Sequence, residues 1–285
     1  MKYLFLASAL MLTSLTASAY FHYPEDRTYT SNDRGYTQYG APSLHHTGKY
    51  ALTFDDGPHP TRTARILDTL KAYNAKALFL VITSNITEGT FPLIKRMLDE
   101  GHLVGSHGLM HDNSDNITKA VWKARVKQSF VDLAKWYKRA GHELTKPYYR
   151  FPYAVYGGRT DHHHLNTLKE ISRELMGENC IHFTFWDHDS GDWIPGMTAA
   201  EVLANYKAFH EGGRVVTYKT VNGKIIKVIK TITEPAGGGV VLQHDIQESS
   251  AQGTAMVLKY FQENNLEAVR IDEVDEFLIT KNCRM

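Results

Sequence analysis

The chain has little cysteine, almost no net charge and only one long hydrophobic run. Its 285 residues carry a formal net charge of +1, which gives no reason to expect nucleic acid or an anionic membrane surface as a partner. Structural zinc sites commonly use cysteine ligands, and neither cysteine lies within the polar motifs described below. Internal repeats and low-complexity tracts are also absent. What remains is a chain long enough for one large domain with a substantial core.

The hydrophobic run lies at the amino terminus and predicts an export signal. Met1 and Lys2 supply a positive start, residues 4–15 are apolar, and Ala17-Ser18-Ala19 has the small-x-small form that signal peptidases cut. The run is too short to span a bilayer comfortably, and no later segment is long and apolar enough. We therefore expect residues 1–19 to be removed and the mature protein to be periplasmic or secreted, without a membrane span. A retained N-terminal anchor is the alternative.

Export bears on the two cysteines, Cys180 and Cys283. In an oxidising compartment they could form a disulfide that joins the C-terminal tail to the body of the protein. Two separate thiols are the alternative, because the sequence does not give the distance between them.

Hydrophobic periodicity predicts an α/β fold after an irregular arm at residues 20–48. Strands are expected at 50–54, 77–82, 102–105, 148–151, 181–186, 240–243 and 266–269. Helices are expected at 62–73, 92–100, 117–139, 165–176, 199–210, 251–264 and near 272–278. Repeated strand-then-helix units predict parallel strands joined by crossover helices, and such folds place their chemistry at the carboxyl ends of the strands.

One basic segment breaks this alternation. Residues 215–221 and 224–229 flank Asn222-Gly223, which is the strongest short hairpin signal. We interpret residues 212–234 as a hairpin insertion that projects from the fold. Its cations are Arg214, Lys219, Lys224, Lys227 and Lys230. It either forms one wall of a substrate groove, where its lysines meet carboxylates of peptidoglycan stems, or is a solvated hairpin whose charges protect its edges.

Two adjacent carboxylates, Asp55 and Asp56, end the first strand before Gly57-Pro58. Adjacent residues of a strand point in opposite directions, but a sharp turn can bring both carboxylates to one site. One can then bind a metal while its neighbour takes a proton. A capping Asp pair at a turn is the alternative.

Two histidines, His107 and His111, follow the third strand. Residues four apart lie on one face if the backbone is helical, and can then bind one ion. Two imidazoles and one carboxylate suit Zn²⁺ with an open position for water, and Co²⁺ or Ni²⁺ are alternatives. A histidine pair is a weak signal by itself in a chain with 15 histidines.

Three further strand ends carry polar residues. Arg150 begins the segment Arg150-Phe151-Pro152-Tyr153, and its guanidinium can keep a carboxylate ionised. The segment 189–193 ends in Asp192-Trp193, an acid beside an aromatic ring that can face a sugar. His244, in Leu242-Gln243-His244, is a candidate proton donor. An ion pair, a polar turn and a structural histidine are the respective alternatives.

These five segments, in this order, resemble the polysaccharide deacetylase domain (NodB homology, carbohydrate esterase family 4) over roughly residues 49–280, and we assign residues 49–285 to it. The resemblance implies a distorted (β/α)7–8 barrel. It implies that the metal ligands are Asp56, His107 and His111. It implies that Asp55 is the general base and that Arg150 holds Asp55 in place. It also implies that His244 is the general acid and that Asp192 orients His244. It also implies that the substrate contacts are Tyr153, through its backbone N–H and ring, and Trp193 and Leu242, around the acetyl methyl group.

Two features depart from the family pattern. Gly108 stands where the family usually has Ser or Thr, so the loop of the second histidine lacks a supporting hydroxyl and we expect weaker support for the metal site. A second histidine-rich segment, His162-His163-His164, predicts a solvated turn before a helix, with an adventitious metal site or a groove wall as alternatives.

The resemblance implies metal-dependent hydrolysis of N-acetyl groups from a polysaccharide that contains GlcNAc or MurNAc. Together with the bacterial-type signal, it makes peptidoglycan the expected substrate, followed by chitin oligomers. An O-acetyl esterase acting on xylan with the same fold is the alternative enzyme. A glycan-binding module without catalysis is a further alternative, and the presence of the complete set of metal and acid–base residues argues against it. We expect a monomer.

Overall fold

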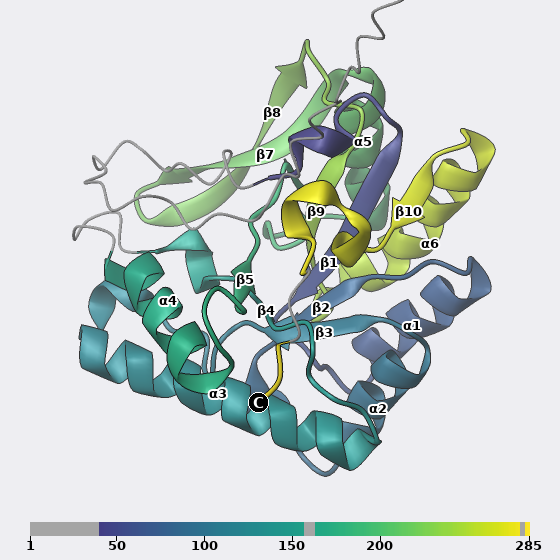
Figure 1. Ribbon diagram of the computed structural model, residues 1–285. Helices are drawn as coiled ribbons and strands as arrows, with labels where there is room; N and C mark the ends of the chain where they lie inside the picture. Colours follow the sequence, from purple (N-terminus) through teal and green to yellow (C-terminus); the bar gives the residue numbers. More distant parts are fainter. Residues whose placement is uncertain (1–39, 157–162, 280–282) are drawn as a thin grey trace, which may run out of the picture.

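A parallel β-sheet forms the centre of the computed structural model, which describes residues 40–156, 163–279 and 283–285 (Figure 1). The strand order is β5-β4-β3-β2-β1-β9-β6, and β10 also pairs with β1. The strands are β1 (Lys49–Asp55), β2 (Leu78–Val81), β3 (Leu103–Ser106), β4 (Tyr148–Tyr149), β5 (His182–Phe183), β6 (His188–Asp189), β9 (Gly239–His244) and β10 (Glu267–Val269). The predicted α/β fold with parallel strands is confirmed.

The sheet must curve, because its two outermost strands are close in sequence. A flat sheet with the seven strands of this order would be about 29 Å wide, from six spacings of about 4.8 Å. The five residue steps from Phe183 on β5 to His188 on β6 span at most about 18 Å. The expected strand at 181–186 was therefore wrong in extent: the chain leaves one end of the sheet and joins the other, which rolls the sheet into a distorted barrel.

In the described ranges six helices follow the strands, close to the residues that periodicity predicts. They are α1 (Arg62–Ala72), α2 (Phe91–Asp99), α3 (Lys119–Ala140), α4 (His163–Leu175), α5 (Ala199–Glu211) and α6 (Glu248–Glu263). Local signals fix several ends: Thr198 and Glu201 form a capping box at the start of α5, and α3 ends at Gly141 in the left-handed conformation. The helix expected near 272–278 is wrong, because extended Val274 separates two short 3₁₀ turns.

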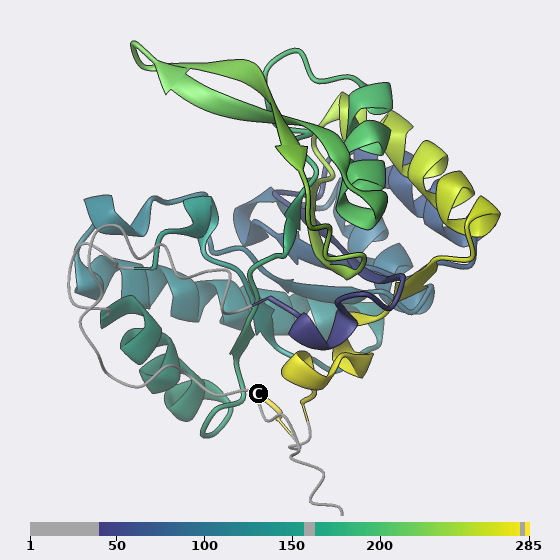
Figure 2. The ribbon, with the colours of Figure 1, turned by 90° about the horizontal axis from the view of Figure 1, so that it is seen from above.

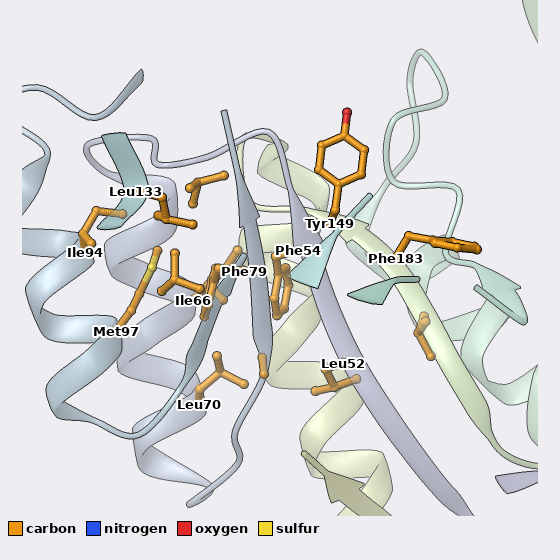
Figure 3. Close-up of a cluster of buried hydrophobic side chains, with 14 of the residues drawn as sticks. Leu52, Phe54, Ile66, Leu70, Phe79, Ile94, Met97, Leu133, Tyr149 and Phe183 are labelled. Atoms are coloured by element: carbon orange, nitrogen blue, oxygen red, sulfur yellow. The ribbon is translucent and has the colours of Figure 1, made fainter. Parts of the chain in front are cut away.

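The main hydrophobic core lies between the sheet and the helices (Figure 3). Leu52 and Phe54 of β1 point into it, where Phe54 stacks on Phe79 of β2 with ring centroids 5.2 Å apart. Ile66 and Leu70 of α1 pack into the same cluster. Because side chains alternate along a strand, Asp55 points to the other face of the sheet. The packing of β1 thus decides which face receives the carboxylate.

The first and last described segments pack on this body. Residues 1–39, which include the predicted signal and most of the predicted arm, lie outside the described residues. Buried Ala41 donates its backbone N–H to Asp187, and Leu44 is also buried. At the other end, Cys180 and Cys283 form a disulfide with a Cα–Cα distance of 5.6 Å, which decides between the two alternatives for the cysteines.

The hairpin β7 (Gly213–Val221) and β8 (Lys224–Ile232) forms a separate two-stranded antiparallel sheet. It projects away from the rest of the molecule, as Figure 2 shows.

Within the described ranges, no helix has the length and apolar character needed to cross a bilayer.

Replacing Cys283 with Ala should lower the free energy of unfolding by about 2–4 kcal/mol, because the disulfide closes a loop with a sequence separation of 103 residues. Urea denaturation under oxidising conditions measures the change. The double variant Cys180→Ala/Cys283→Ala should match the single variant. An unfolding midpoint of the wild type that does not change on reduction would contradict the expectation.

Candidate active site

The turn after β1 brings two adjacent carboxylates to one side. Asp56 has a φ of +77°, a left-handed conformation that is uncommon outside glycine and redirects its side chain. The Nε2 atom of His107 lies 3.8 Å from Oδ2 of Asp55 and 3.5 Å from Oδ1 of Asp56. Both carboxylates therefore face the same imidazole, as we expected from the sharp turn after the strand.

The two histidines meet through a loop and not a helix. His107 directly follows β3, and its Nδ1 lies 2.9 Å from the carbonyl oxygen of Arg150. His111 places Nε2 3.4 Å from Oδ1 of Asp56. The helical spacing considered for the pair is wrong, because Gly108 has a φ of +93° and turns the chain.

These three side chains fit a divalent cation. One ligand atom from each of Asp56, His107 and His111 lies within 4.8 Å of the others. Ligands about 2.1 Å from a tetrahedral ion are about 3.4 Å apart, close to the distances from Asp56 to each imidazole. Oδ1 of Asp56 is buried and has no hydrogen-bond partner among the described residues, which a buried carboxylate oxygen rarely tolerates. Burial lowers the pKa of His107 to about 3, so its imidazole is neutral and can donate a lone pair.

The histidine loop is supported without a hydroxyl at Gly108. The Ser106 hydroxyl accepts a hydrogen bond from the Gly108 N–H at 3.0 Å and lies 2.8 Å from the Ser129 hydroxyl. The backbone N–H of Thr83 donates to the Gly108 carbonyl at 3.0 Å. The Ser106 hydroxyl and the Gly108 backbone thus hold this loop, although a side-chain hydroxyl is absent at position 108.

Arg150 is fully buried and holds Asp55. Its Nη1 donates to Asp55 Oδ1 and to the Thr53 hydroxyl, both at 2.8 Å. Its other nitrogens donate to the carbonyls of Thr184 and Phe185 at 3.1 and 2.9 Å. Burial raises the pKa of Asp55, and the Arg150 guanidinium opposes this by stabilising the carboxylate. One oxygen of Asp55 is thus fixed while Oδ2 faces the histidines.

His244 is held by Asp192 on the other side of β1. It ends β9 directly beside Asp55 in the strand register. Its Nδ1 lies 2.8 Å from Asp192 Oδ1, and its backbone N–H donates to Asp192 Oδ2 at 2.6 Å. Burial disfavours the charged imidazole, but the Asp192 carboxylate, together with the smaller effects of Asp55 and Asp56, outweighs it and raises the pKa of His244 to about 10. The ring is therefore protonated at neutral pH, with Nε2 left to donate.

Two predicted substrate contacts are aromatic. Tyr153 is 61% exposed, and its ring centroid lies 4.3 Å from that of His111. Its φ of +58° is strained for a tyrosine and aims the ring at the histidine. Trp193 donates Nε1–H to Asp189 Oδ2 at 3.1 Å. Leu242 is buried in β9, two residues before His244, and its role beside the acetyl methyl group stays a prediction.

Asp245, which the sequence did not indicate as part of the site, lies beneath the turn that follows β1. Asp245 is fully buried and accepts a hydrogen bond from the Thr63 hydroxyl at 2.6 Å. A Cβ on Gly57 would lie 2.0 Å from this carboxylate, so only glycine fits there. Burial raises the pKa of Asp245 to about 7. The one available signal was its position directly after His244.

The second histidine-rich segment is not a solvated turn throughout. His164 is buried near the start of α4, with its ring centroid 4.9 Å from that of Trp122. It therefore packs in the core, so His164 neither lines a groove nor forms an exposed metal site. His162 lies outside the described residues, and the His163 side chain is not described.

The chain is similar in sequence and fold to known proteins. Residues 45–170 match the family model for polysaccharide deacetylase. The peptidoglycan-N-acetylglucosamine deacetylase PgdA of Listeria monocytogenes is 28% identical over 226 residues, which cover 79% of this chain and 38% of that protein. Residues 45–170 of this chain carry a polysaccharide deacetylase domain. The chain thus spans well under half of the length of that longer relative.

Two further proteins extend the family comparison. A peptidoglycan-N-acetylglucosamine deacetylase of Bacillus cereus is 27% identical over 233 residues, covering 81% of this chain and 89% of that protein. The structure of peptidoglycan deacetylase PdaC from Bacillus subtilis matches with a TM-score of 0.58 at 22% identity, covering 83% of this chain and 92% of that one. At that identity the likeness shows the fold, which is the NodB-type (β/α) barrel.

Replacing Asp56 or His111 with Ala should weaken zinc binding by more than the ~10–100-fold that is typical of losing a supporting residue. The metal content of desalted, zinc-loaded protein measures this. Asp55→Asn is the matched control and should keep its zinc, because the Asp55 side chain lies beside the three ligands and is not one of them. Equal zinc content in all the variants would show that the ion binds elsewhere.

Proposed function

We propose that this protein is an exported, metal-dependent N-deacetylase that releases acetate from GlcNAc or MurNAc residues of peptidoglycan. The observation that carries the proposal is one arrangement of charges. Three cation ligands lie beside a carboxylate held by Arg150, and a separate imidazole held by Asp192 ends the neighbouring strand. Amide hydrolysis needs a base for the water and an acid for the amine, and this arrangement offers both.

The base is Asp55 in this proposal. A divalent cation, which we propose to be Zn²⁺ with Co²⁺ or Ni²⁺ as alternatives, supplies polarisation of the amide carbonyl and a lowered pKa of water when it is bound by Asp56, His107 and His111. Asp55 Oδ2 faces the same place and accepts the proton of the attacking water. Arg150 stabilises the ionised form of this carboxylate against the effect of burial and fixes one of its oxygens, so that the proton transfer needs little reorganisation.

The acid is His244. The C–N bond breaks easily only if the departing amine receives a proton, and His244 carries one at neutral pH because of Asp192. Asp192 occupies Nδ1 and so directs Nε2 toward the substrate. The Tyr153 backbone N–H would stabilise the oxyanion, and Trp193 and Leu242 would enclose the acetyl methyl group.

The substrate and the compartment rest on different observations. The first relatives described above are peptidoglycan deacetylases by name, and their substrate lies outside the cytoplasm. The predicted signal at residues 1–19 and the disulfide are consistent with export. Chitin oligomers and acetylated xylan are the other substrates that this site could accept.

The deciding experiment measures acetate released by the purified protein from peptidoglycan, a chitin oligomer and acetylated xylan, each with and without chelator. We expect release from peptidoglycan that chelation abolishes and added zinc restores. Release from xylan alone would replace the proposal with an O-acetyl esterase. A metal-loaded protein that binds glycan but releases no acetate would reduce it to a binding module.

Asp55→Asn should lower kcat by about 100-fold or more, because an amide cannot accept the proton of the attacking water. Acetate release under saturating substrate measures the loss, with the zinc content checked in the same sample. Turnover near the wild-type rate with zinc in place would refute the assignment of the base.

Asp192→Asn should move the alkaline limb of the kcat/KM profile to lower pH by about 1–3 units. Asp192 raises the pKa of His244, so its loss lowers that pKa, and the imidazolium that donates the proton disappears at a lower pH. A profile measured from pH 6 to 11 tests this. A uniform loss of rate with unchanged limbs would mean that Asp192 acts on position alone.

A further inference from the structure

The β7–β8 hairpin contributes nothing to the catalytic arrangement above, yet it contacts one of its loops. Tyr218 on β7 packs edge-on against Trp193, with ring centroids 4.7 Å apart and an interplanar angle of 70°. Trp193 directly follows Asp192, the residue bonded to His244. The hairpin therefore touches the loop that holds the proposed acid.

A buried side chain also clamps the base of the hairpin to this loop. Asn205 of α5 accepts a hydrogen bond from the Val216 N–H at 2.8 Å and donates to the Val216 carbonyl at 2.9 Å. The same amide donates to the Ser190 carbonyl at 2.9 Å. Because Asn205 is fully buried, these bonds are shielded from water and fix β7 relative to the loop of Asp192.

The second strand has its own attachment. Lys227 on β8 forms an ion pair with Glu201 of α5 at 2.7 Å and donates to the Gly196 carbonyl. Lys227 is paired with Tyr218 across the hairpin, so the two anchoring side chains lie on the same face. This face is held against the body of the protein.

The opposite face carries three lysines. Residues alternate between the faces of a strand, and residues paired across the ladder share a face. Lys219 is paired with Ile226, and the other two pairs on this face are Val221 with Lys224 and Val215 with Lys230. Lys219, Lys224 and Lys230 therefore lie on the face opposite Tyr218 and Lys227, and they form what we call the basic face.

Nothing in the hairpin neutralises the basic face. Residues 212–233 contain no Asp or Glu. All three lysines are exposed, and none forms an ion pair or a hydrogen bond with any part of the chain that the structure describes. Three uncompensated cations on a rigid arm produce a local positive potential on a protein with almost no net charge.

We propose that the basic face binds the carboxylates of an anionic polysaccharide and so docks the polymer substrate beside the active site. This inference rests on the proposed function and narrows its substrate class, because peptide-bearing peptidoglycan carries carboxylates whereas chitin carries none. An anionic membrane offers similar charges. The polysaccharide is favoured because Asn205 and Tyr218 fix the hairpin to the loop of the proposed acid, so that a long polymer held on the hairpin is tethered to the part of the protein that carries the site of reaction.

The test compares two triple variants that remove equal charge. Lys219→Gln/Lys224→Gln/Lys230→Gln removes the basic face. Lys71→Gln/Lys135→Gln/Lys259→Gln removes three lysines whose side chains are 70%, 69% and 66% exposed on α1, α3 and α6. Both variants should keep the zinc content and the melting temperature of the wild type. Binding is measured by co-sedimentation with purified peptidoglycan sacculi, which requires no turnover.

Loss of the basic face should raise Kd for sacculi about three- to tenfold at low salt, as expected for a few exposed ion pairs. The control variant should bind as the wild type does. The difference should vanish near 1 M salt, where the screening length is about 3 Å. A wild type that binds sacculi through this face but releases no acetate would refute the proposed deacetylase while leaving the docking surface in place.

Three results would overturn the docking proposal. Equal binding of the two variants to sacculi would leave the basic face without a role in substrate binding. Weaker binding to vesicles of anionic phospholipid, with unchanged binding to sacculi, would assign the face to a membrane. Self-association of the variant that lacks the basic face, again with unchanged binding to sacculi, would show that the lysines only keep the strand edges from pairing between copies.

Discussion

The candidate site depends on one buried guanidinium. Arg150 bonds the side chains of Thr53 and Asp55 on β1 and the carbonyls of Thr184 and Phe185 between β5 and β6. Its own carbonyl oxygen lies 2.9 Å from the Nδ1 atom of His107. A buried charge without water needs hydrogen-bond partners, and here they come from two parts of the curved sheet. The positions of the proposed base and of one proposed metal ligand are therefore both set by Arg150.

The site separates its two proton-transfer groups by giving each a different charged neighbour. Asp55 lies against the fixed cation of Arg150, which favours its ionised form. His244 lies against Asp192, which favours the protonated imidazole. The two groups end adjacent strands of one sheet, so the parallel register brings them close while their charged neighbours favour opposite protonation states. The proposed hydrolysis of an amide would use this arrangement, which requires two buried charged pairs.

The hairpin shows how a peripheral element can be coupled to such a site without joining its core. Its two strands pair only with each other, and their stability as a ribbon comes from attachment to α5 through Asn205 and Lys227. The attachment face contacts the loop of the proposed acid, and the three lysines of the basic face are exposed to solvent. A polymer longer than the active site itself could use both surfaces at once.

The sequence by itself determined the order of the elements, the residues of the strand ends and the hairpin, because hydrophobic periodicity and Asn-Gly turns are local signals. It did not show that the strand expected at 181–186 is divided between the two ends of the sheet, or that a loop and not a helix joins His107 to His111. Both depend on contacts between residues far apart in the chain. Only the tertiary structure joined Cys180 to Cys283, buried Asp245 beneath Gly57 and turned Tyr218 toward Trp193. Distances of this kind follow from how the strands pack, and no pattern within a single segment encodes them.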